Sequence, residues 1–318
     1  MLIGALLLVG GMLLVLWGAE RFTDGTVRTA MRFGLSTFYV GAVVSGFEPE
    51  NLITGVTASA EHLPQIALGT VIGSAIFMLT GGLGVALMLV PMEVRIPREG
   101  GLAMIASMVP FSIAIWNDGA VSRGEGAVLI LVAIGLMAWL YRRSPVFLRE
   151  VESLDEGAAR RRPGVRALML LVAGVAVMLL GAELVVHGVR TLLSAVRLSE
   201  TFLGMTVVGM GESLEETARM VVPARRGHPE LAWGNVVGTL VILVAFNLGV
   251  IALVRPLAAD PLVLRLHAPY LIACTVLVAS ALLKARKLGR SMGLLLIGLY
   301  LAYLVINIAF RAEPVSQR

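Results

Sequence analysis

The chain has 318 residues, of which 58% are hydrophobic and only 15% are charged. A soluble domain carries roughly 25% charged residues, so the composition excludes an ordinary soluble protein even though the length would allow two domains. The net charge of +5 does not indicate nucleic-acid binding, because the arginines lie in loops between apolar segments, and we expect no nucleic-acid partner. The single Cys274 excludes an intrachain disulfide and a cysteine-based metal cluster.

Apolar segments long enough to cross a bilayer, which takes about 20 helical residues, follow one another along the chain. Those without Asp, Glu, Lys or Arg are residues 2–19, 66–92, 100–117, 126–141, 231–254, 266–283 and 291–310. Those interrupted by charged residues are 36–60, 167–190 and 201–222. The first segment has no basic residue before it, so we interpret it as a spanning helix and not as a signal peptide. The sequence predicts an all-α polytopic membrane protein with about ten transmembrane helices.

Loop charge predicts the orientation. Lys and Arg outside the apolar segments are concentrated in the odd-numbered loops, which the positive-inside rule places in the cytoplasm, with both termini outside. We expect a prokaryotic-type plasma membrane. The longest loop, residues 142–165, mixes arginines with carboxylates and is interpreted as a solvated cytoplasmic linker. It separates a first five-helix repeat, 1–141, from a second, 166–318.

The two halves resemble each other in sequence. Gly18-Ala19-Glu20 matches Gly181-Ala182-Glu183, and residues 64–74 line up with residues 229–239. Because each half has an odd number of helices, the second inserts upside down. Inverted repeats of this kind are common in secondary transporters, whose substrate sites lie near the midplane at interrupted helices.

Each half carries carboxylates inside an apolar segment: Glu48 and Glu50 in the first, and Glu212, Glu215 and Glu216 in the second. A charge at a helix centre costs roughly 2.5–3.5 kcal/mol on insertion. These acids must therefore face a polar cavity, form pairs, take up protons or bind cations.

Helix-disfavouring residues adjoin these acids. Gly46 and Pro49 flank Glu48, and Gly209 and Gly211 precede Glu212, so local unwinding is expected in both halves. Carboxylates and freed carbonyls are the oxygen ligands that Ca²⁺ and Na⁺ prefer. The sequence therefore indicates a cation site near the midplane.

Two further patterns accompany the acids. Small residues spaced by four, which are Gly69 and Gly73 in one half and Gly234 and Gly238 in the other, predict close helix packing. Ser74 and Thr239 follow them and either ligate a cation or bond back to their own helices.

Arg219 lies one helical turn after Glu215. A local salt bridge is the preferred interpretation. The alternative is that Arg219 acts as a tethered cation that replaces a transported ion.

With these motifs the chain resembles the cation/Ca²⁺ exchanger superfamily, which includes sodium/calcium exchangers. Each half of that family carries a motif close to Gly-Thr-Ser-Leu-Pro-Glu, followed by Ala-Leu-Gly-Asn-Val-Ile-Gly-Ser-Asn. Residues 211–216 match the first motif without a gap, and Pro49-Glu50 match its last two positions. The resemblance implies that Glu50 and Glu216 bind the cation. It implies that Ser213, Ser74 and Thr239 assist, while Glu48, Glu212 and Asn51 complete or tune the site.

One departure from the family concerns sodium. Sodium/calcium exchangers carry Asn or Asp four residues after the motif serine, where this chain has Met78 and Leu243. We therefore expect coupling to another ion or to protons.

The resemblance implies an antiporter that exchanges a divalent cation, with Ca²⁺ favoured, for Na⁺ or H⁺. Its partners would be these cations and the lipid bilayer, with no cofactor and no enzymatic activity. The alternatives are a transport-inactive sensor or scaffold with the exchanger fold, or a membrane-embedded lipid-modifying enzyme that uses the paired acids.

Overall fold

The computed structural model describes residues 2–33, 36–46, 48–60, 62–94, 96–143, 165–194 and 209–312. Most of the predicted linker 142–165 lies outside the described residues, and so do residues 201–208 of the predicted segment 201–222.

Helices dominate both halves of the described chain. The first half contains α1 (Leu2–Phe33), α2 (Thr37–Val40), η1 (Gly41–Ser45), α3 (Pro49–Ala60), α4 (Pro64–Phe77), η2 (Met78–Gly82), α5 (Leu83–Leu89), α6 (Arg98–Trp116) and α7 (Arg123–Arg143). The second half contains α9 (Val165–Ser194), α11 (Gly209–Arg225), α12 (Pro229–Val241), η5 (Ile242–Asn247), α13 (Leu248–Val254), η6 (Val263–His267), α14 (Ala268–Lys284) and α15 (Arg290–Ala312). The η elements are wider π-helical turns, so α4 to α5 and α12 to α13 are continuous rods that each contain one such turn.

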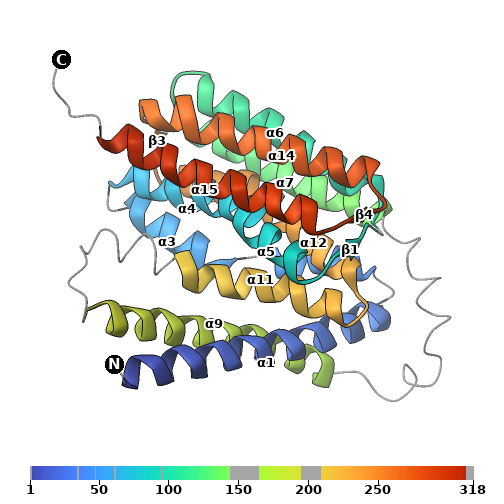
Figure 1. The fold of residues 1–318 in the computed structure, drawn as a ribbon. Helices are drawn as coiled ribbons and strands as arrows, with labels where there is room; N and C mark the ends of the chain where they lie inside the picture. Colours follow the sequence, from blue (N-terminus) through green and yellow to red (C-terminus); the bar gives the residue numbers. More distant parts are fainter. Residues whose placement is uncertain are drawn as a thin grey trace.

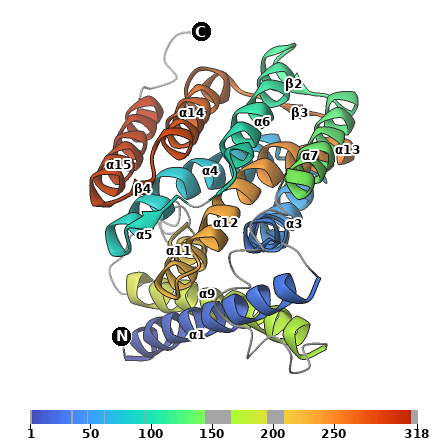
Figure 2. The ribbon, with the colours of Figure 1, turned by 90° about the vertical axis from the view of Figure 1, so that its right-hand side faces the viewer.

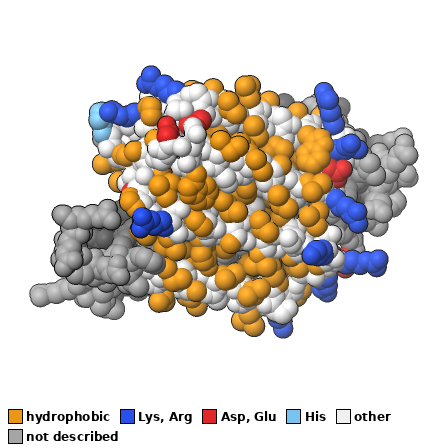
Figure 3. Space-filling model, turned by 90° about the horizontal axis from the view of Figure 1, so that it is seen from above, with side chains coloured by type: hydrophobic (Ala, Val, Ile, Leu, Met, Phe, Trp, Pro, Cys, Tyr) orange, Lys and Arg blue, Asp and Glu red, His pale blue; other side chains and the backbone are white. Residues whose placement is uncertain are grey.

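Within the described residues, seven helical stretches are long and apolar enough to cross a membrane, and Leu168–Gly181 forms a shorter apolar helix. Figure 3 shows one face of the molecule as a broad apolar band with Lys and Arg gathered at its two margins. An apolar band between basic margins fits a bilayer core between two headgroup layers. The protein is therefore a polytopic α-helical membrane protein.

The helices are arranged in three groups (Figures 1 and 2). α1 and α9 lie side by side at one edge, α4–α5 and α12–α13 run through the middle, and α6, α7, α14 and α15 form the opposite side, with α11 between the first two groups. The main core joins the middle and far groups. A separate small core lies between α1, α9 and α11 and consists of Val15, Ala19, Phe22, Leu171, Met178, Ala218 and Val222.

Glycines bring α1 and α9 into close antiparallel contact. They recur every seven residues in both helices, at Gly4, Gly11, Gly18 and Gly25 in α1 and at Gly174, Gly181 and Gly188 in α9. A Cβ at Gly174 would lie 2.4 Å from the backbone nitrogen of Phe22, and one at Gly188 would lie 2.6 Å from that of Leu8. Such backbone contact needs glycine on the facing stripe, so α1 and α9 form one tight unit.

The first helix is longer than predicted. The sequence places its end at Glu20, but α1 continues to Phe33. The acids on this continuation have a basic partner, since Arg226 lies 3.3 Å from Glu20 and 2.6 Å from Asp24. Glu20 therefore pairs with an arginine of the second half. Glu183 also lies inside its helix, α9.

Two pairs of short antiparallel strands join the halves, and the sequence predicted neither. β1 (Met92–Glu93) pairs with β4 (Lys287–Leu288), and β2 (Ala120–Val121) pairs with β3 (Leu257–Ala258). Each pair links a loop of one half to a loop of the other, which holds the two halves in register.

Candidate cation site

The first acidic segment is broken where the sequence predicted. The helix formed by α2 and η1 ends at Ser45, and α3 begins at Pro49. Between them lies Glu48, which is buried and whose carbonyl accepts the first backbone bond of α3, from Leu52. The break thus carries a carboxylate into the interior at the start of a new helix.

Close crossing of α12 over η1 fixes the position of this break. A Cβ at Gly238 would lie 1.9 Å from the carbonyl oxygen of Ala42, and one at Gly46 would lie 2.5 Å from the backbone of Gly238. Gly234 similarly contacts the carbonyl of Phe38. The predicted packing role of Gly234 and Gly238 is confirmed.

The corresponding prediction for the first half has no described partner. No described residue lies within 4 Å of a Cβ placed at Gly69 or Gly73. The repeat would pair them with residues 201–205, which lie outside the described residues, so their packing role stays a prediction.

A hydrogen-bonded network gathers four of the predicted site residues. The amide nitrogen of Asn51 donates to Glu48 Oε2 at 2.5 Å, and Ser74 Oγ donates to Asn51 Oδ1 at 3.2 Å. From the other half, Thr239 Oγ1 donates to Glu48 Oε1 at 3.4 Å. These side chains come from the break, α3, α4 and α12, so Glu48 is a hub between the two halves. The hydroxyls of Ser74 and Thr239 turn into the site and do not bond back to their own helices.

α11 adds a second carboxylate to this hub. Glu216 is 8% exposed, and its carboxyl lies near that of Glu48. Its Oε2 has no hydrogen-bond partner among the described residues. Two buried acids from different halves therefore lie near each other, an arrangement that a shared proton, a bound cation or a neighbouring basic side chain stabilises.

The predicted salt bridge on α11 is present. The Arg219 guanidinium contacts the Glu215 carboxylate one turn away, and both side chains are almost fully buried. This pairing leaves Glu216 facing Glu48.

The remaining predicted ligands cannot be placed as side chains. Glu50 lies in the first turn of α3, and Glu212 and Ser213 lie in the first turns of α11. Their side chains lie outside the described residues, so their convergence with Glu216 stays a prediction. Across the described residues, no group of three or more His, Cys, Asp or Glu could hold a metal ion. The described oxygens near Glu48 are those of carboxylates with amide and hydroxyl groups beside them.

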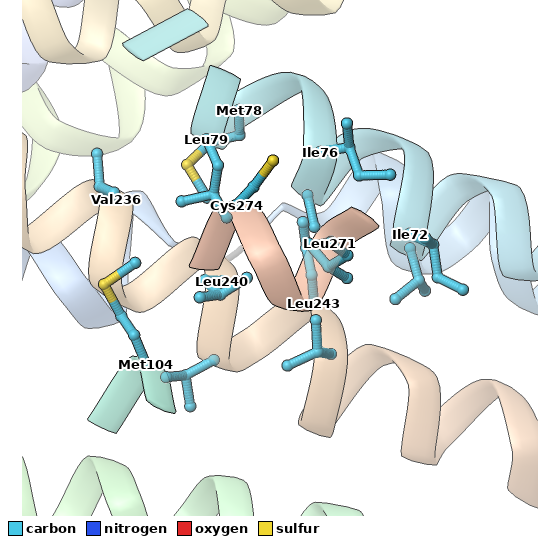
Figure 4. Close-up of a cluster of buried hydrophobic side chains, with 14 of the residues drawn as sticks. Ile72, Ile76, Met78, Leu79, Met104, Val236, Leu240, Leu243, Leu271 and Cys274 are labelled. Atoms are coloured by element: carbon cyan, nitrogen blue, oxygen red, sulfur yellow. The ribbon is translucent and has the colours of Figure 1, made fainter. Parts of the chain in front are cut away.

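Met78 and Leu243, which occupy the positions of Asn or Asp in the related family, are surrounded by apolar side chains. Figure 4 shows Met78 and Leu243 within a cluster that includes Leu79, Leu240 and Leu271. Met78 and Leu243 are both fully buried. The polar site therefore ends at Ser74 and Thr239, and the next turn of each helix is hydrophobic.

Sequence reasoning missed one polar residue near this boundary. Asn247 is completely buried, and neither polar atom of its side chain has a hydrogen-bond partner among the described residues. It lies four residues after Leu243, one turn further along the same face. The four-residue spacing from Leu243 was the signal by which the sequence could have identified Asn247.

Comparison with known proteins agrees with these features. The family model for the sodium/calcium exchanger protein matches residues 3–142 and 166–309. Inner membrane protein YrbG of Escherichia coli is 29% identical over 96% of this chain and 97% of its own. The sodium/calcium exchanger MaX1 of Methanosarcina acetivorans is 24% identical over 95% of this chain and 97% of its own.

The fold has a solved counterpart as well. A structure of the sodium-calcium exchanger NCX_Mj superimposes with a TM-score of 0.80 at 25% identity, covering 95% of this chain and 98% of that one. Since the family model covers most of both halves and the fold agrees, this chain belongs to the sodium/calcium exchanger protein family of cation transporters.

Proposed function

We propose that the protein is a secondary active antiporter that exchanges a divalent cation, Ca²⁺ being favoured, for Na⁺ or H⁺. The observation that carries the proposal is the burial of Glu48 and Glu216, two neighbouring acids from opposite halves, beside a network of amide and hydroxyl oxygens. Two facing carboxylates are neutralised equally by one divalent cation, two monovalent cations or two protons. Exchange among these occupants follows from charge balance alone.

The proposed site contains more than the described network. Glu50 and Glu216 are the principal ligands, Glu48 joins the halves, and Ser74, Thr239 and Asn51 supply neutral oxygens. Glu212 and Ser213, in the first turns of α11, complete the set. An emptied site would leave desolvated carboxylates in the bilayer, which is costly. That cost opposes movement of the empty carrier and enforces coupling.

The proposed architecture is ten helices in two inverted repeats, 1–141 and 166–318, with 142–165 between them. Several matching details support it. Both middle rods begin at a proline, Pro64 or Pro229, and both contain a π-helical turn beside the site.

Alternating access would come from movement of α1 and α9 together against the other helices. The glycine contacts bind these two helices to each other, while among the described residues a small separate core and the partly exposed ion pairs of Arg226 attach them to α11 and the turn after it. A thin interface of this size permits sliding more readily than the main core does.

The orientation can be tested separately. With Cys274 changed to Ser, single cysteines at Ala158 and Ser316 should react with impermeant reagents from opposite sides, the loop from the cytoplasm and the C-terminus from outside. Reaction from the same side would refute the ten-helix arrangement.

The function is tested by Ca²⁺ flux in proteoliposomes. An outward gradient of Na⁺ or H⁺ should drive Ca²⁺ uptake in the wild type but not in Glu216→Gln. If the wild type moves no Ca²⁺ under either gradient, or if Glu216→Gln transports normally, the proposal is wrong.

A further inference from the structure

The buried acidic cluster contains its own positive charge. The guanidinium of Arg219 is 2% exposed and contacts Glu215. Glu216 is the next residue on α11 after Glu215 and is buried near Glu48, so the charges of Arg219 and Glu48 act on it as well. Glu48, Glu215, Glu216 and Arg219 therefore form one electrostatic group and not an isolated ion pair beside a site.

Arginine differs from every other cation that this site could hold. Its guanidinium stays protonated at any physiological pH, and it is tethered one turn from its partner on the same helix. It cannot leave during a transport cycle, so its charge is present in every state of the carrier.

A second observation points in the same direction. The turn beyond Ser74 and Thr239 carries Met78 and Leu243, which are fully buried in the apolar cluster of Figure 4. Neither side chain supplies an oxygen to a hard cation. Next to Ser74 and Thr239 the described residues therefore lack the two oxygen ligands that the family motif has at the positions of Met78 and Leu243. Arg219 in turn reduces the negative charge that additional ions would neutralise.

We propose that Arg219 is a built-in cation of the exchange site, which takes the place of one monovalent cation and so lowers by one the number of Na⁺ or H⁺ exchanged for each divalent ion. The inference rests on the proposed function and deepens it, because it assigns the coupling ratio to a particular side chain. The guanidinium offsets one of the three described carboxylates, Glu48, Glu215 and Glu216, and so leaves one charge fewer for ions from solution to neutralise.

The test is the coupling ratio, measured in proteoliposomes as the Na⁺ or H⁺ gradient at which net Ca²⁺ flux vanishes. Arg219→Gln should raise the ratio by about one monovalent ion per Ca²⁺, because the vacated place is then filled from solution. Arg219→Lys, which keeps the charge, should retain the wild-type ratio. The double variant Glu215→Gln/Arg219→Gln, which removes one charge of each sign, should also retain it.

If Arg219→Gln does not fold, the loss of a negative charge in Glu215→Gln provides the test instead. Glu215→Gln should lower the ratio by about one, because the guanidinium then offsets Glu216. For a variant that folds without transporting, the slope of Ca²⁺ affinity against the logarithm of Na⁺ or H⁺ concentration reports the same number.

The outcomes separate the two proposals. A wild-type ratio in Arg219→Gln, or in Glu215→Gln where the first variant does not fold, would show that Arg219 only pairs with Glu215, and the inference would be wrong while the antiporter stands. A wild type without Ca²⁺ flux would refute both.

Discussion

The crossing of α12 over η1 gives the sharpest test of how packing positions the site. Gly238 sits against the backbone of Ala42, where an added Cβ would lie 1.9 Å from the carbonyl oxygen and 2.4 Å from Cα. Non-bonded heavy atoms settle at about 3.5 Å, so Gly238→Ala must push the two elements apart by roughly 1.5 Å. Both partners are backbone, so side-chain rotation cannot relieve the clash.

This displacement would directly lengthen a hydrogen bond of the site, because Thr239 follows Gly238 and donates to Glu48 at 3.4 Å. A shift of that size would stretch the bond well beyond hydrogen-bonding distance. Overpacking of this kind costs about 1–3 kcal/mol, which for a chain of this size corresponds to a fall in Tm of roughly 2–10 °C. We expect Gly238→Ala to lower Tm and to reduce Ca²⁺ flux more than the loss of folded protein explains.

A matched control is available in Gly135→Ala on α7, where no described residue lies within 4 Å of the new Cβ. That variant should keep or slightly raise Tm, since alanine is the better helix former. Thermal unfolding in detergent and flux per folded protein would be measured for both. Equal Tm and equal flux in the two variants would refute the argument that this glycine contact positions Glu48.

The other predictions concern ions and movement. Glu50→Gln and Glu216→Gln should each abolish divalent transport with equal or higher thermal stability and without Ca²⁺-induced stabilisation; wild-type rates in both would move the site elsewhere. A pH gradient should drive Ca²⁺ uptake at least as well as a Na⁺ gradient, and strict Na⁺ dependence would contradict this. Arg226→Gln should change Tm little, because its partly exposed ion pairs with Glu20 and Asp24 contribute about 0–1 kcal/mol to the free energy of unfolding. It should nevertheless alter the exchange rate, because α1 is then no longer attached to the turn before α12. The reversed pair, Arg226→Asp with Asp24→Arg, should restore the rate if the ion pair is responsible.

Sequence reasoning succeeded where one residue type has few alternatives. Pro49 cannot donate a backbone hydrogen bond, so a break beside it was predictable, and the structure places it there. The Glu215–Arg219 pair followed from helical spacing alone. The close approach at Gly234 and Gly238 followed from small residues one turn apart.

The relative roles of the first-half acids were less predictable. A helical pattern fixes which side chains share a face only while the helix continues, and the break at 46–48 ends that continuity. Sequence alone therefore could not decide whether Glu48 or Glu50 faces Glu216, and Glu48 was expected to complete or tune the site. The structure makes Glu48 the hub, since it receives bonds from Asn51 and Thr239.

The extent of α1 was missed for a different reason. A search for uncharged segments stops at the first charge, whereas a helix stops only where its backbone bonds end. Glu20 and Asp24 lie within the continuing helix and pair with Arg226, about two hundred residues later. Contacts between distant residues of this kind, like the two-residue strand pairs, depend on the assembled fold.

The boundary at Ser74 and Thr239 connects the packing to the coupling ion. Each hydroxyl faces the Glu48 network, and one turn later Met78 and Leu243 belong to the hydrophobic cluster. A monovalent ion bound in that turn would need oxygen ligands that neither side chain has. We therefore expect the ions that replace a divalent cation to bind in the polar layer around Glu48 and Glu216. Protons fit there without added ligands, because each binds directly to a carboxylate, and this is why we expect a pH gradient to drive exchange at least as well as a sodium gradient.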